Sequence, residues 1–153
     1  MNALLSLTEH MSELEHAYSL VFCETAVNRR NRGRFLAGST KTGADFRLAA
    51  ASCADFTEAR LEHSTFDEAD LAYSAFFGAH LTRCTFRFAE LYWAGFSHSV
   101  MSGVDFTEAS LCGADFTGVE GLKSCRFKAA KTDSSTVWPV DFDFEALGLR
   151  GHR

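Results

Sequence analysis

Large apolar side chains recur at every fifth position through the middle of this chain. Counting by fives from Phe46 to Phe116 gives fourteen large apolar residues and a single small one, Ala51. The residues are Phe46, Ala51, Phe56, Leu61, Phe66, Leu71, Phe76, Leu81, Phe86, Leu91, Phe96, Met101, Phe106, Leu111 and Phe116. A period of five fits neither the helical turn of about 3.6 residues nor the alternation of a simple strand.

A second series, made of small residues, lies two positions before the first. From Ala44 to Ala114 it holds ten alanines, three serines, Cys84 and Val104. The other three places in each group of five are mostly Asp, Glu, Thr, Ser, Arg and Gly. This spacing predicts a chain that turns a corner every five residues and sends one large and one small side chain inward from each side.

The units ADFTE (54–58), ARLEH (59–63), ADLAY (69–73) and ADFTG (114–118) resemble the pentapeptide-repeat family, whose pattern is A(D/N)LXX. The resemblance implies an all-β fold, a right-handed quadrilateral β-helix with four pentapeptides in each coil. We expect this β-helix over residues 44–130. The coils stack about 4.8 Å apart, as strands do, so the fifteen units give a rod roughly 20 Å long.

Residues twenty apart then become vertical neighbours in the stack. Two columns consist of phenylalanine, from Phe46 to Phe106 and from Phe56 to Phe116, and they face each other. The two columns between them hold mainly leucine. We therefore expect a narrow, solid core filled by matching side-chain size, which accounts for most of the fifteen phenylalanines in the chain.

Both ends of the repeats are expected to carry caps. The period slips by one residue between Gly118 and Leu122 and then continues through Leu122 and Phe127. The following stretch TVWPVDF (136–142) resembles the Trp-Pro tail that is common after the last coil in this family. Trp138 and Phe142 would cover the exposed edge, and the capping tail is predicted over residues 131–153.

Residues 1–43 are predicted to form an N-terminal helical cap and a connector. Leu4, Leu7, Met11, Leu14, Tyr18 and Val21 have the spacing of an amphipathic helix. This helix either covers the first coil or contacts the same helix of a second protomer. Residues 24–43 show no pattern, and their arginine run from Arg29 to Arg34 is either a solvated segment, a site for phosphate or an acidic partner, or a group that pairs with the acidic repeats.

The composition narrows the function classes. The net charge of −5 argues against direct nucleic-acid binding, and no apolar stretch approaches the length of a membrane span. The chain has no secretory leader pattern and five cysteines without a C-x-x-C motif, so we expect reduced thiols in the cytoplasm. A solid rod offers no catalytic pocket, and His63, His80 and His98 fall on different corners. We therefore expect no enzyme activity, no cofactor and no metal site.

Five aromatic residues fall at outward positions and form the candidate partner-binding surface: Tyr73, Phe77, Phe88, Tyr92 and Trp93. Tyr73 and Trp93 are twenty apart and therefore neighbours along the stack. Exposed apolar patches of this kind mark interaction sites. The surface would hold a protein partner or a second copy of the chain, unless the N-terminal segment folds back over it.

The leading interpretation is a non-enzymatic protein-interaction or scaffold module whose partner is unknown. The alternative is a DNA-mimicking protein that binds a type II topoisomerase (DNA gyrase), as the quinolone-resistance members of the family do. Outward acids favour that alternative: Asp45, Asp55, Glu58, Asp67, Glu68, Asp70, Glu90, Asp105, Glu108 and Asp115. They are expected on three sides and interrupted by arginines, and the rod is shorter than the roughly 34 Å of one DNA turn.

Overall fold

The structure, a computed structural model, describes residues 36–147 and 149. The helix predicted over residues 4–21 and the arginine run from Arg29 to Arg34 lie outside these residues. Within the described part of the chain, no helix has the length and apolar character needed to cross a bilayer.

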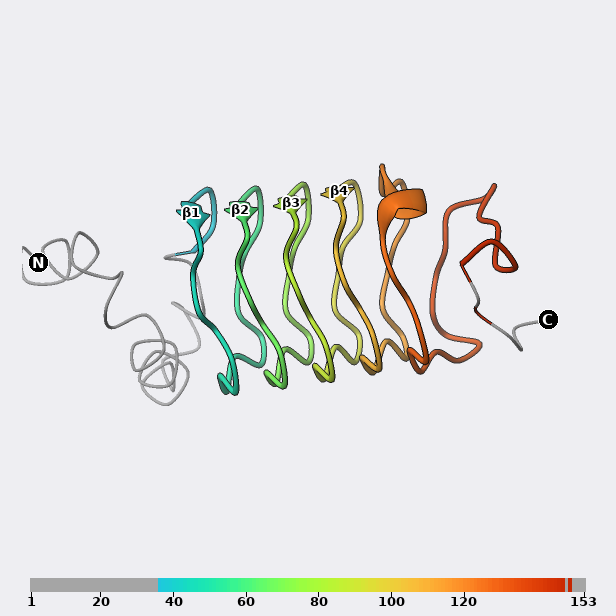
Figure 1. The fold of residues 1–153 in the computed structure, drawn as a ribbon, viewed down its shortest axis with the longest axis horizontal. Helices are drawn as coiled ribbons and strands as arrows, with labels where there is room; N and C mark the ends of the chain where they lie inside the picture. Colours follow the sequence, from blue (N-terminus) through green and yellow to red (C-terminus); the bar gives the residue numbers. More distant parts are fainter. Residues whose placement is uncertain (1–35, 148, 150–153) are drawn as a thin grey trace, which may run out of the picture.

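Four short strands form a parallel sheet along one side of the molecule. They are β1 (Thr40–Thr42), β2 (Arg60–Glu62), β3 (His80–Thr82) and β4 (Val100–Ser102), and they pair in that order. His80 lies opposite Arg60 in one strand pair and opposite Val100 in the next, a separation of twenty residues each time. The predicted twenty-residue register is therefore confirmed, and Figure 1 shows the resulting row of similar coils.

Three further lines of parallel bridges follow the strands around each coil, five residues apart. They pass through Thr65↔Thr85, Asp70↔Glu90 and Ala75↔Gly95. Each coil thus has four sides, which we name by one bridging residue: the strand side (59–63, 79–83, 99–103), the Thr85 side (44–48, 64–68, 84–88, 104–108), the Glu90 side (49–53, 69–73, 89–93, 109–113) and the Gly95 side (54–58, 74–78, 94–98, 114–118).

Tight turns produce the corners between sides. At one corner the amide of Ser74 donates to the carbonyl of Leu71 (3.1 Å), and at the next Ala79 donates to Phe76 (3.0 Å). The third residue of these turns has a positive φ, 59° at Tyr73, as a type II turn requires. The five-residue period is therefore the length of one extended side plus one turn.

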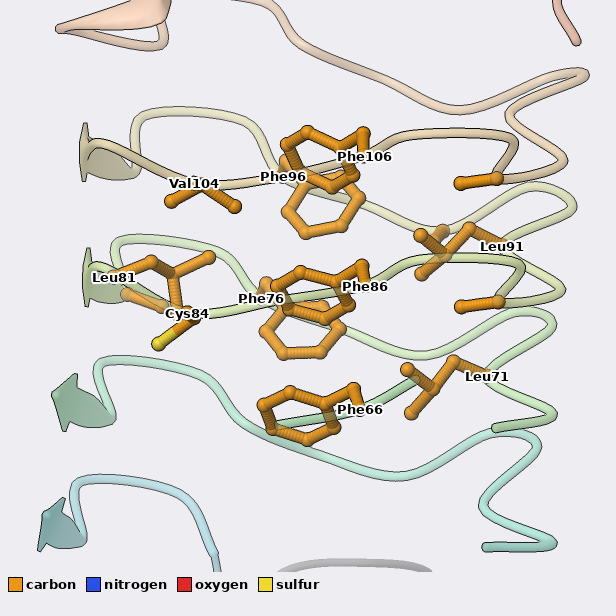
Figure 2. Packing of buried hydrophobic residues seen from close by; sticks show 14 of the residues in the cluster. Phe66, Leu71, Phe76, Leu81, Cys84, Phe86, Leu91, Phe96, Val104 and Phe106 are labelled. Atoms are coloured by element: carbon orange, nitrogen blue, oxygen red, sulfur yellow. The ribbon is translucent and has the colours of Figure 1, made fainter. Parts of the chain in front are cut away.

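Stacked phenylalanine rings fill the core, as predicted from the two columns of phenylalanines in the sequence. Phe66 lies 4.7 Å from Phe46 and 4.7 Å from Phe86 between ring centroids, with nearly parallel planes. The facing column packs equally closely, with 4.9 Å between Phe76 and Phe96. Rings of the two columns meet edge to face, as Phe76 and Phe86 do at 5.7 Å (Figure 2). These rings are at most 2% exposed, so the core is solid.

The register slips near the C-terminal end, where the sequence predicts it. Asp105 bridges Arg126, a separation of 126 − 105 = 21 residues. Gly121 accommodates the extra residue with a φ of 83°, and a Cβ atom there would collide with the carbonyl oxygen of Met101. A short 3₁₀ helix, η1 (Leu122–Ser124), follows. Phe127 then stacks on Phe106 at 5.1 Å and continues the column.

The Trp-Pro tail extends the other aromatic column. Trp138 stacks on Phe116 at 4.7 Å with an angle of 5° between the planes, and Phe142 stacks on Trp138 at 4.3 Å. Phe144 meets both rings edge to face. The aromatic stack therefore continues beyond the repeats into the tail.

Regular pairing begins earlier than the five-residue pattern indicates. Strand β1 falls within residues 24–43, and its Lys41 is the partner of Leu61. Leu36, twenty residues before Phe56, is half-buried against the core. Because Lys41 is not apolar, the sequence pattern does not reveal this first coil.

Candidate interaction surface

All five aromatic side chains of the predicted surface are exposed. Their exposed fractions run from 40% at Tyr92 to 63% at Tyr73. Three of them occupy turn positions with positive φ, namely Tyr73, Phe88 and Trp93. A left-handed backbone costs a residue with a side chain about 1–2 kcal/mol relative to glycine. The structure thus displays large aromatic residues at places where glycine would be less strained.

Three of the five aromatic residues gather around one corner. Tyr73 and Trp93 occupy the same turn on neighbouring coils, and Tyr92 precedes Trp93 within that turn. We call these three residues the aromatic corner. Phe88 belongs to the preceding turn and Phe77 to the following one, so each lies one corner away, across the Glu90 side and the Gly95 side respectively. The surface therefore consists of a central group of three residues and one flanking residue on each side.

Glycines in the next coil make room for the side chains of Trp93 at the aromatic corner and of His98 at the corner that follows. A Cβ atom on Gly113 would lie 2.5 Å from Cδ2 of Trp93, so the indole covers that glycine. His98 covers Gly118 in the same way, with Nδ1 2.7 Å from the Cβ position. The His98 ring also meets the edge of Phe77, 5.7 Å away between centroids. These contacts fix how the aromatic side chains lie on the surface.

Charge is segregated around the coils. The Glu90 and Gly95 sides, which meet at the aromatic corner, contain no lysine or arginine between residues 49 and 118. Their charged residues are Asp55, Glu58, Asp70, Glu90 and Asp115. All four arginines of the repeats lie on the other two sides: Arg47, Arg60, Arg83 and Arg87. The expected interruption of acids by arginines is thus confined to those two sides.

Asp67 is a correction to the predicted set of outward acids. Its residue is 8% exposed, and its Oδ2 accepts hydrogen bonds from Nη2 (2.7 Å) and Nε (3.0 Å) of Arg87. The Arg87 amide donates to Oδ1 of the same carboxylate (3.0 Å). This hydrogen bonding raises the pKa of Arg87 above its usual value. Asp67 therefore joins two coils and presents little charge to a partner.

Residues 36–147 and 149 also include histidines, cysteines and a hollow outside the aromatic corner. These residues contain no group of three His, Cys, Asp or Glu side chains that could hold a metal ion. Cys53, Cys84, Cys112 and Cys125 are free thiols, and burial raises the pKa of Cys84 to about 11. An open hollow lies over the last coil, between residues 124–129 and the tail residues Ala146 and Leu147.

A family model described as Pentapeptide repeats, in eight copies, matches residues 65–103 and 89–120. Residues 65–120 belong to the pentapeptide-repeat family. No functionally curated protein matches the sequence significantly. The assignment thus rests on the repeats, and it agrees with the resemblance seen in the sequence.

Solved pentapeptide-repeat structures resemble this pentapeptide-repeat chain. Rfr23 from the cyanobacterium Cyanothece 51142 is 26% identical, with a TM-score of 0.42 over 65% of this chain and 63% of that one. A thylakoid-lumen protein of Arabidopsis thaliana is 25% identical, with a TM-score of 0.49 over 69% and 71%. The fluoroquinolone resistance protein QnrB1 is 16% identical, with a TM-score of 0.33 over 80% and 86%. This chain spans slightly less than two thirds of the length of Rfr23.

The exposed aromatic residues could be identified from the sequence, but the distribution of charge around them becomes visible only when the repeats are wrapped into coils. Wrapping the repeats in groups of twenty places every arginine on two sides and leaves the acids alone on the others. That signal is present in the residues themselves. The cover that Trp93 provides for Gly113 depends on the direction in which the side chain leans, which the repeat pattern does not contain.

Proposed function

We propose that this chain is a non-enzymatic protein-interaction module that holds a protein partner on its aromatic corner. The scaffold is a right-handed, four-sided β-helix with a tail cap built on Trp138. The observation that carries the proposal is the exposure of Tyr73, Tyr92 and Trp93 around one corner of a rigid stack, with Phe77 exposed at the next corner.

The energetics of association support this assignment. Aromatic side chains are enriched at the centres of protein interfaces, where burying them contributes much of the affinity. The coils beneath the corner are joined by main-chain hydrogen bonds, such as that from the Tyr73 amide to the Tyr92 carbonyl (2.8 Å). A preordered backbone loses little conformational entropy on binding, so the same contacts give higher affinity.

A chemical role has less support from the described residues. Stacked phenylalanine rings occupy the interior, and the aromatic corner is a convex feature rather than a cleft. General catalysis needs convergent groups around a bound substrate. The free cysteines fit a reducing compartment, and we propose that the protein acts in the cytoplasm.

Light scattering and affinity capture with three matched proteins test the proposal. The proteins are the wild type, a Tyr73→Ser/Trp93→Ser variant and a Leu48→Ser control. Leu48 is 61% exposed and occupies the same kind of positive-φ turn on another corner, so it matches the loss of apolar surface. We expect a dimer or a captured partner that the double variant loses and the control keeps. A wild-type monomer that captures the same proteins as the double variant would contradict the proposal.

DNA mimicry is the alternative, and the Glu90 and Gly95 sides are its best support because their charges are all acidic between residues 49 and 118. Four coil steps, from Asp45 to Arg126, span roughly 19 Å at strand spacing, which is less than one DNA turn of about 34 Å. Binding by mimicry would depend on Asp70 and Glu90 and would be insensitive to loss of Tyr73 and Trp93. Replacing both acids with Asn and Gln in the capture experiment separates the two functions.

A further inference from the structure

The aromatic corner combines exposed rings with carboxylates and lacks any cation of its own. We propose that its partner presents an arginine-rich segment, whose guanidinium groups lie against the rings and pair with the carboxylates. This inference rests on the proposed function and names the chemistry of the partner.

Charge complementarity is the first argument. On the Glu90 side, Asp70 and Glu90 are bridge partners on neighbouring coils, so their side chains project about 4.8 Å apart. Tyr92 and Trp93 lie two and three residues after Glu90 on the same coil. Two like charges at this spacing repel each other, and a basic partner removes that repulsion. These two sides hold no lysine or arginine between residues 49 and 118, and Lys131 lies two coils beyond Glu90 on the Glu90 side. The cation that pairs with Asp70 and Glu90 therefore has to come from elsewhere in the chain or from a partner.

The Gly95 side supplies a floor on which a flat cation can lie. Its bridge column reads Asp55, Ala75, Gly95 and Asp115 along the stack, with small residues between two acids. No heavy atom lies within 4 Å of a Cβ atom placed on Gly95, so the space above this floor is open. Phe77 borders the floor on one edge, and the corner residue Trp93 borders it on the other.

The carboxylates at the ends of this floor are held in place by the backbone. Oδ1 of Asp55 accepts the amide of Thr57 (2.9 Å), and Oδ1 of Asp115 accepts the amide of Thr117 (2.8 Å). Asp70 makes the same contact with Ala72 at 3.1 Å. Each contact engages one carboxylate oxygen and leaves Oδ2 directed away from that bond. Preordered acceptors of this kind favour guanidinium, which presents several N–H donors in a fixed plane.

Arginine is preferred to lysine at such a surface for a physical reason. A guanidinium stacks on an aromatic ring while its edge donates hydrogen bonds, and it is more weakly hydrated than an ammonium group. A purely acidic surface would bind lysine and arginine comparably. The ratio of the two affinities therefore reports whether the rings take part.

Fluorescence anisotropy with two labelled peptides tests the inference on the full chain. One peptide alternates arginine and glycine, and the other has lysine in place of every arginine. At an ionic strength of about 0.1 M, where charges are screened beyond about 10 Å, we expect the arginine peptide to bind about tenfold more tightly. In Tyr73→Ser/Trp93→Ser we expect that preference to disappear, whereas Leu48→Ser retains it.

A charge placed on the floor provides a second, independent variant. Gly95→Arg adds a cation where the structure has open space, and we expect it to weaken arginine-peptide binding at least tenfold. Val100→Arg is the matched control, because Val100 is 37% exposed and occupies the equivalent bridge position on the strand side. Unchanged far-ultraviolet circular dichroism of both variants shows that the fold is retained.

Three results would overturn the inference. The first is equal binding of the two peptides with no effect of the ring substitutions, which indicates an acidic surface alone. The second is no binding of either peptide by a protein whose partner capture still depends on Tyr73 and Trp93; the proposed function then survives and only the arginine chemistry fails. The third is tighter binding after serine replaces Arg29, Arg30, Arg32 and Arg34, which identifies the chain's own arginines as the occupant.

Discussion

Phe86→Ala removes a ring from the middle of the core and gives the sharpest test of how the stack is stabilised. Phe86 is fully buried and touches four rings. It stacks on Phe66 at 4.7 Å and Phe106 at 5.2 Å, and it meets Phe76 and Phe96 edge to face at 5.7 and 6.1 Å. Truncating a buried phenylalanine to alanine costs about 3–5 kcal/mol, and the four ring contacts place this site at the upper end.

The cost of removing a ring should also depend on where the ring lies along the stack. Phe46, in the same column, has ring contacts with Phe56 and Phe66 among the described residues. Each aromatic pair contributes about 0.5–1.5 kcal/mol beyond simple burial, and Phe46 has two fewer pairs, so Phe46→Ala is expected to cost about 1–3 kcal/mol less than Phe86→Ala. A stack in which each coil contacts its neighbours predicts this dependence on position.

Equilibrium unfolding in urea, followed by circular dichroism and extrapolated linearly, measures both differences. Phe88→Ala is the matched control, since Phe88 lies two residues away and is 52% exposed. We expect Phe88→Ala to change the free energy of unfolding by less than about 0.5 kcal/mol. The reasoning is refuted if Phe86→Ala lies within about 1 kcal/mol of that control, or if Phe46→Ala is the more damaging substitution.

Three further outcomes follow from particular side chains. Gly121→Ala is expected to lower the free energy of unfolding by about 3 kcal/mol or more, because the added Cβ atom collides with the backbone of Met101. Gly43→Ala is the control and should cost about 1 kcal/mol, because Gly43 has a φ of 67° but open surroundings. Equal urea midpoints of the two variants would contradict this. Because burial raises the pKa of Cys84 to about 11, the unfolded chain releases that proton first, so the free energy of unfolding falls as the pH rises from about 9 to 11. Cys84→Ala should flatten that part of a pH series, and an unchanged slope would count against it. Relative to its quenching of a free, uncharged tryptophan analogue, each ion reports the charge around Trp93: caesium should be more effective and iodide less effective, because carboxylates surround this corner. A Trp93→Phe variant isolates the stacked Trp138, and equal relative quenching of Trp93 by both ions would refute the charge argument.

The core was accessible from the sequence because one geometric rule governs every side of every coil. Once the period of five is recognised, a separation of twenty identifies vertical neighbours, and the stacked pair Phe66 and Phe86 follows without further information. The slip before Leu122 was equally visible, because it shifts the apolar residues by one place. The exposure of Trp93 follows from its position in the repeat.

Features that depend on local geometry were not accessible. Asp67 has the sequence position of a surface acid, and only the placement of Arg87 on the next coil explains why it is buried. Lys41 fills a place that the pattern reserves for an apolar residue, so the first described coil was read as an irregular connector. The contact between Trp93 and Gly113 depends on rotamers, which repeats do not specify.

The regular register has a consequence for how such a chain tolerates changes in length. Inserting or deleting twenty residues translates everything downstream by about 4.8 Å along the axis and leaves each side facing its former direction. Five residues instead rotate the downstream coils by a quarter turn and set phenylalanine above leucine. Ten residues rotate them by half a turn and restore phenylalanine above phenylalanine, so the core is preserved while the acidic and arginine-bearing sides exchange places. The length of the rod and the direction in which its sides face can therefore change independently: length changes in steps of twenty residues, and facing direction in steps of five.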